Sequence, residues 1–118
     1  MPSDTIQRVH PGKRLSSATV HGSTIYLAGQ VASDPSMDIK AQTRDVLSQI
    51  DRLLGELGSS KSRLLSVTIY LADMADFAAM NEVWDAWAPR PDLPARATVQ
   101  AKLARPEYKI EIQAIAAT

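Results

Sequence analysis

The sequence of 118 residues contains no cysteine. This absence excludes disulfide bonds, thiolate nucleophiles and thiolate metal sites together. A net charge is absent too, because thirteen Lys and Arg residues balance thirteen Asp and Glu residues. A neutral chain has little general attraction for nucleic acid or for an anionic membrane, so we expect neither as a partner.

Long apolar runs are also missing. No stretch approaches the roughly 20 apolar residues that span a membrane, and Met1–Thr5 lacks the apolar core of a secretory signal. We therefore expect a cytoplasmic protein. With 45% apolar residues, the chain has the size and composition of one globular domain over residues 1–118.

Several common site motifs are absent as well. His10 and His21 are the only histidines, and neither has a second ligand at helical or turn spacing, so we expect no metal site. No Gly-x-Ser-x-Gly nucleophile elbow occurs.

Two helices stand out in the apolar pattern. Apolar residues recur at three- and four-residue spacing from Val46 to Leu57, and this helix can be capped by Asp38 or Ser36 and ended by Gly58. A second helix is expected from about Met74 to Trp87, with Asp73 as its N-cap. Its apolar face would hold the four core residues Phe77, Met80, Trp84 and Trp87.

The remaining segments predict strands. Gly22-Ser23 suits a type II′ turn between two of them, and Leu65, Val67, Ile69 and Leu71 alternate with polar residues in another. The fold class is therefore α+β, in the order β-β-β-α-β-α-β-β, with a mixed sheet and two helices on one face. The expected strands cover residues 6–9, 19–21, 24–28, 65–71, 94–101 and 109–116.

The face of the sheet away from the helices is expected to be polar. It would be rich in Ser, Thr, Gln and Tyr, which favours a contact surface buried in an oligomer over an open solvated face. Its predicted members are Ser66, Thr68, Tyr70, Arg96, Thr98, Gln100, Lys109, Glu111 and Gln113.

Arg96 and Glu111 are the strongest candidate site residues on this face. A guanidinium is a fixed fork that matches a carboxylate. If the last two strands form a hairpin that turns near Pro106, Arg96 and Glu111 lie five residue pairs apart, roughly 17 Å. Cooperation between them then requires either a bulge or two different subunits.

Five segments of the chain, taken together, resemble the YjgF-type Rid family in order and spacing. The resemblance runs from about Val20 to Ala117. The five segments are Leu27–Gln30, Gln42–Arg44, Leu71–Asn81, Pro94–Val99 and Ile110–Ala116.

The resemblance implies a chorismate-mutase-like fold assembled as a homotrimer, with ligand clefts between subunits. It also implies hydrolysis of 2-aminoacrylate and related imino acids to 2-keto acids and ammonia, without metal or cofactor. Arg96 matches the family's carboxylate-binding arginine, Glu111 the glutamate associated with the hydrolytic water, and Asn81 a pocket asparagine. Gly29 completes the matched pocket.

Three pocket positions depart from better-known members of the family. Leu15 stands at or near a tyrosine, Ala28 replaces a serine, and Thr98 replaces a cysteine. We still assign Leu15, Ala28 and Thr98 to the substrate pocket. The departures keep an alternative open, a non-catalytic binding module for small keto acids. RNA cleavage or translational inhibition, a role suggested for some relatives, is a third reading, against which the neutral charge weighs.

Overall fold

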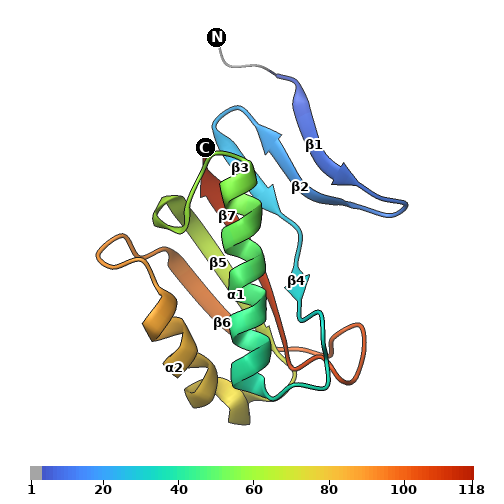
Figure 1. Cartoon of the computed structure of the whole chain (residues 1–118), viewed down its shortest axis with the longest axis vertical. Coiled ribbons are helices and arrows are strands. Elements are labelled where there is room, and N and C mark those ends of the chain that lie inside the picture. The colour runs from blue at the N-terminus through green and yellow to red at the C-terminus, as the bar shows by residue number, and fades with distance from the viewer. Residues whose placement is uncertain (1–3) are drawn as a thin grey trace.

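The computed structural model describes residues 4–118 (Figure 1). Residues 1–3, which form part of the segment expected to lack a secretory core, lie outside the described residues. The helices are α1 (Ile39–Glu56) and α2 (Phe77–Trp87), with 3₁₀ turns η1 (Lys61–Arg63) and η2 (Met74–Asp76). The strands are β1 (Ile6–Pro11), β2 (Ser16–His21), β3 (Thr24–Leu27), β4 (Gln30–Val31), β5 (Leu64–Leu71), β6 (Ala95–Gln100) and β7 (Ile110–Ala117).

The described strands form one mixed sheet in the order β1-β2-β3-β7-β5-β6, and the short β4 also pairs with β7. β5 and β6 are parallel, whereas the other pairs are antiparallel. Both helices lie on the same face of the sheet (Figure 1). The predicted α+β class and element order are confirmed, with β4 as an additional short strand. No helix within residues 4–118 combines the length and apolarity needed to cross a membrane.

The core lies between the sheet and α1. Ile25, Ile69 and Ile112 from three strands are fully buried, and α1 adds Val46 and Leu54. Burying such side chains contributes about 1.5–3 kcal/mol each, so this layer holds the sheet and helix together.

Local chemistry sets the ends of α1. The Asp38 side chain accepts a hydrogen bond from the Ala41 amide at 2.9 Å, which makes Asp38, and not Ser36, the N-cap. Gly58 has a positive φ of 73°, and the Ser59 amide bonds to the Leu54 carbonyl at 2.9 Å. This geometry is a Schellman ending, so Gly58 occupies the predicted position.

Two apolar residues lie outside the core that the sequence predicts for them. Leu65 is 51% exposed and Leu64 is buried, because the β5–β7 register shifts between Leu64 and Ser66. A bulge of this kind turns the following residues to the other face. Phe77 is 38% exposed, since it lies in the first turn of α2, whose buried residues begin at Met80. Asp73 caps η2, which precedes α2, instead of capping α2 itself.

The predicted C-terminal hairpin is wrong. β6 pairs with β5, where Arg96 lies opposite Val67, and β7 pairs with the other edge of β5, where Glu111 lies opposite Tyr70. β5 therefore separates the last two strands. Nine residues, 101–109, connect them, which is long enough to cross the end of one strand. Sequential strands are often neighbours, but here α2 returns the chain to a parallel position beside β5.

The prediction that β6 contributes its polar side chains to the open face of the sheet is therefore wrong. Arg96 and Thr98 lie opposite the buried residues Val67 and Ile69, and paired residues project to the same side of a sheet. Arg96, Thr98 and Gln100 therefore belong to the side that the helices cover. Four strand residues, Ser66, Thr68, Tyr70 and Gln113, remain on the open face with Glu111.

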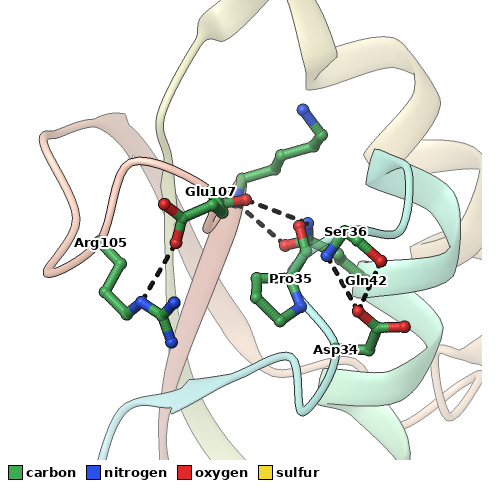
Figure 2. A network of polar contacts seen from close by, with 7 residues as sticks. Asp34, Pro35, Ser36, Gln42, Arg105 and Glu107 are labelled. Carbon is green, nitrogen blue, oxygen red and sulfur yellow. Dashed lines mark hydrogen bonds and ion pairs between the residues drawn. The ribbon is translucent and has the colours of Figure 1, made fainter.

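Gln42 joins the start of α1 to the segment that leads into β7. Its buried side chain donates from Nε2 to the carbonyl oxygens of Pro35 (3.1 Å), Met37 (2.9 Å) and Glu107 (3.3 Å). Its Oε1 accepts from the Lys109 amide at 3.0 Å. Figure 2 shows Gln42 between the Pro35 loop and the Glu107 loop. This bridge fixes the backbone two residues before Glu111.

Candidate functional site

The first cluster of predicted site residues lies between β6 and α2, and we call Arg96, Thr98, Asn81 and Trp84 the arginine half-site. The guanidinium carbon of Arg96 lies 5.1 Å from the Trp84 ring centroid, a cation–π contact that sequence reasoning missed. Burial lowers the pKa of Arg96, and the carboxylate of Asp85 partly opposes this effect. Arg96 makes no ion pair with a described residue. It is a partly buried cation without a direct ion pair among residues 4–118.

Two predicted residues accompany Arg96. Thr98 lies two residues further along β6 on the same side, and its buried Oγ1 has no hydrogen-bond partner among the described residues. Asn81 lies on α2 three residues before Trp84, a spacing that makes the two side chains neighbours on the helix. An unpaired buried hydroxyl beside an unpaired cation is suited to binding a polar ligand.

The second cluster is the glutamate half-site, formed by Glu111, Gly29, Ala28 and Leu15. On β7, three residue steps separate Ile115 from Ile112, whereas four steps separate their partners Tyr26 and Gln30. The β3–β4 segment therefore holds one extra residue, and a bulge results near Gly29.

This irregularity brings Gly29 against the carboxylate of Glu111. A Cβ atom added to Gly29 would lie 2.0 Å from Oε2 of Glu111. Glycine is needed here for close approach, since no side chain fits between the backbone and the carboxylate. Glu111 itself accepts no hydrogen bond from a described residue, so its oxygens remain available to a water or a ligand.

Leu15 and Ala28 line an open cavity of about 480 Å³ that adjoins Gly29 along the chain. The Ala28 amide bonds to the Ser17 carbonyl at 2.9 Å, which ties this segment to β2. Leu15 is 65% exposed, so an apolar side chain stands at the surface of the cavity.

The two half-sites do not meet within one chain. Arg96 and Glu111 lie opposite residues three apart on β5 and on strands two positions apart, a separation of roughly 14 Å between their Cα atoms. They also project from opposite faces of the sheet. The register from Ser66 to Leu71 is continuous on both edges of β5, so no bulge between them brings them together.

Known proteins are similar to this chain in both sequence and fold. A family model described as endoribonuclease L-PSP matches residues 5–118. A RutC family protein of Haemophilus influenzae is 47% identical over 116 residues, covering 95% of this chain and 97% of the relative. The chain belongs to the YjgF/RutC family. The resemblance found in the sequence, on segments that include Arg96, Gly29 and Glu111, is thus confirmed.

Other members of the YjgF/RutC family agree with this assignment. The RutC family protein YoaB of Escherichia coli is 46% identical, with 96% of this chain and 98% of the relative covered. The crystal structure of NMB1025, a YjgF family member from Neisseria meningitidis, superposes with a TM-score of 0.92 at 45% identity. That match covers 98% of this chain and 96% of the other.

Proposed function

We propose that this YjgF/RutC protein hydrolyses reactive 2-imino and enamine acids of the 2-aminoacrylate type to 2-keto acids and ammonia. The observation that carries the proposal is Arg96, a partly buried guanidinium without an ion-pair partner among the described residues. A substrate carboxylate would form a charge-assisted, bidentate pair with it. That pairing favours the charged form of Arg96 and so offsets the effect of burial on its pKa.

The reaction needs few protein groups. The enamine tautomerises to an imine, whose carbon is electrophilic. Glu111 orients the water and takes a proton from it as the new C–O bond forms. The proton then passes to the imine nitrogen, which gives a carbinolamine. Glu111 next moves the hydroxyl proton of the carbinolamine to the same nitrogen, so that the C–N bond breaks as the C=O bond of the keto acid forms and ammonia leaves. Fixing the carboxylate on Arg96 supplies proximity and orientation.

A homotrimer is part of the proposal, because one molecule must contact both half-sites. Arg96 of one subunit would face Glu111 of the next across a cleft between them. The open sheet face supports this arrangement, since it exposes Tyr26 and Val99 beside the polar residues of β5 and β7. Sedimentation equilibrium that shows a stable monomer at micromolar concentration would overturn the shared cleft.

The test of the activity is turnover. The protein is incubated with 2-aminoacrylate or a longer imino acid generated in situ, and keto acid release is followed. We expect Arg96→Ala to lower the rate on the order of 100-fold, because the substrate loses its anchor. Equal rates for the wild type and Arg96→Ala would show that Arg96 does not have this role.

A non-catalytic module that binds keto acids is the second candidate function. The apolar residues Leu15 and Ala28 favour it, because they leave the glutamate half-site with fewer polar groups to manage a water. A thermal shift with pyruvate or 2-oxobutyrate, together with no turnover of any imino acid, would support binding alone. The family model's description names RNA cleavage, but a chain with zero net charge attracts RNA weakly.

A further inference from the structure

A cluster of positive charge borders the glutamate half-site and has no role in the reaction above. The cavity of about 480 Å³ that Leu15 and Ala28 line is also lined by Arg8, Lys13 and Arg14, and no acidic residue of the described part of the chain lines it. We call it the basic cavity. The chain as a whole has zero net charge, so the three cations around this cavity form a local cluster of positive charge that the overall composition does not predict.

These three cations have no ion-pair partner in the part of the chain that the structure describes. Arg8, Lys13 and Arg14 make no ion pair with any residue from 4 to 118. Elsewhere the chain does pair exposed charges, as Lys40 does with Glu82 and Arg105 with Glu107. The basic cavity therefore keeps its charge available to an anion from outside.

The fold places the basic cavity on the same side of the sheet as Glu111. Arg8 pairs with Thr19, and Thr19 pairs with Tyr26, so the three residues form one row across β1, β2 and β3. Tyr26 pairs in turn with Ile115 of β7. Ile115 lies an even number of residues from Glu111, which puts this row on the open face with the glutamate.

We propose that the basic cavity binds a second anionic group of the substrate, so that the preferred substrates are imino acids with two anionic groups. The inference rests on the proposed function: the 2-carboxylate would bind Arg96 of one subunit, and the second group would enter the basic cavity of the subunit that supplies Glu111. Ala28 and Gly29 connect the cavity to that glutamate along the backbone. The second group is a carboxylate or a phosphate-like group, because guanidinium and ammonium groups bind both.

The first experiment measures binding without turnover. Titration calorimetry compares pyruvate, oxaloacetate and phosphonopyruvate, which share a three-carbon 2-keto skeleton and differ in the second anionic group. We expect one or both doubly anionic ligands to bind about tenfold more tightly than pyruvate, with a difference that shrinks at high salt. The ligand that binds more tightly than pyruvate identifies whether a carboxylate or a phosphate-like group is preferred.

The variant Lys13→Ala/Arg14→Ala tests whether the cavity is responsible. Both residues are exposed, so their removal leaves the core intact. The preference over pyruvate should fall to about twofold or less in this variant. Arg44→Ala is the matched control, since Arg44 is an exposed arginine on α1 that should leave the preference unchanged. Equal affinities for all three ligands, or a preference that survives in the double variant, would overturn the inference.

Turnover separates failure of this inference from failure of the proposed function. Wild-type protein is given 2-iminopropanoate and 2-iminosuccinate, each generated in situ by an amino acid oxidase. Hydrolysis of both without preference, together with equal affinities for the keto acids, contradicts the second anion site and leaves the deaminase proposal standing. Hydrolysis of neither, with the binding preference intact, contradicts the deaminase proposal and supports the anion site.

Discussion

The arginine half-site lies beneath α2, whereas the glutamate half-site lies on the open face of the sheet with no helix over it. Arg96 is held against Trp84, and burial lowers its pKa. Glu111 rests against the backbone of Gly29 and accepts no hydrogen bond from the described residues. The arginine half-site thus holds a cation in place, whereas the glutamate half-site presents a carboxylate that has no hydrogen-bond partner among the described residues.

This contrast agrees with the proposed roles, in which the arginine half-site binds the substrate and the glutamate half-site carries out the proton transfers. A fixed cation near an aromatic ring binds and orients an anion without moving during the reaction. A carboxylate that accepts and returns a proton needs access to water instead. Because the halves face opposite sides of one sheet, the proposed shared site requires a second copy of the chain.

The largest expected effect comes from Glu111→Gln. Removing the base should lower kcat for imine hydrolysis by about 10²–10⁴-fold. KM should change little, because the carboxylate anchor on Arg96 remains. Steady-state kinetics beside Arg96→Ala measures the difference, and we expect Arg96→Ala to raise KM as well as lower kcat. A Glu111→Gln protein with normal kcat would remove Glu111 from the chemistry.

Mixing the two variants tests whether the halves come from different subunits. Arg96→Ala and Glu111→Gln are each expected to be nearly inactive alone. When their subunits are unfolded together and refolded at equal amounts, about a quarter of the clefts should combine an intact Arg96 with an intact Glu111. Recovery of roughly that share of wild-type activity is the expected result. No recovery from properly assembled mixed oligomers would contradict a shared cleft.

The sequence predicts the features that depend on local chemistry. Asp38 caps α1 and Gly58 ends it, because each acts through its own backbone or side chain. The order of the last strands depends on non-local pairing, and alternation alone does not reveal that β5 separates β6 from β7. Leu65 is misplaced for a related reason, since a bulge shifts the phase of alternation.

In the candidate site, too, some features could be predicted from the sequence and others could not. Resemblance to the family points to Arg96, Asn81 and Glu111. Arg96 and Glu111 are far apart within one chain, as predicted, although the C-terminal hairpin from which that separation was derived does not form. The side of the sheet on which Arg96 lies could not be predicted, because a polar residue on an edge strand alternates in the same way whether or not α2 covers it. The apolar pattern predicts Trp84 as a core residue, and a single sequence carries no signal for its contact with Arg96.

Gly29→Ala should have a smaller effect, confined to the glutamate half-site. The new Cβ would lie 2.0 Å from Oε2 of Glu111, so the carboxylate must move. The clash is with the end of a flexible side chain and Gly29 is not at positive φ, so the fold should tolerate it. We expect activity to fall about tenfold through displacement of the base, with a nearly unchanged melting temperature.

Gly55→Ala is the matched control for this substitution. A Cβ on Gly55 has no neighbour within 4 Å, and the residue lies in the last turn of α1. Alanine there should keep full activity and stabilise the protein by up to about 1 kcal/mol. If Gly29→Ala behaves like Gly55→Ala, the close approach to Glu111 has no functional role.

Gln42→Met has the smallest expected effect on the rate of hydrolysis. It acts indirectly, by loosening the backbone that positions Glu111. Methionine has a similar length but cannot replace the hydrogen bonds to Met37, Glu107 and Lys109, so buried backbone groups lose their partners. The free energy of unfolding should fall by about 1–3 kcal/mol, measured by urea denaturation. Because Gln42 fixes the approach to Glu111 and not to Arg96, kcat should fall more than the affinity for pyruvate. An equal loss in both would mean that Gln42 supports the fold as a whole and does not act selectively on the glutamate half-site.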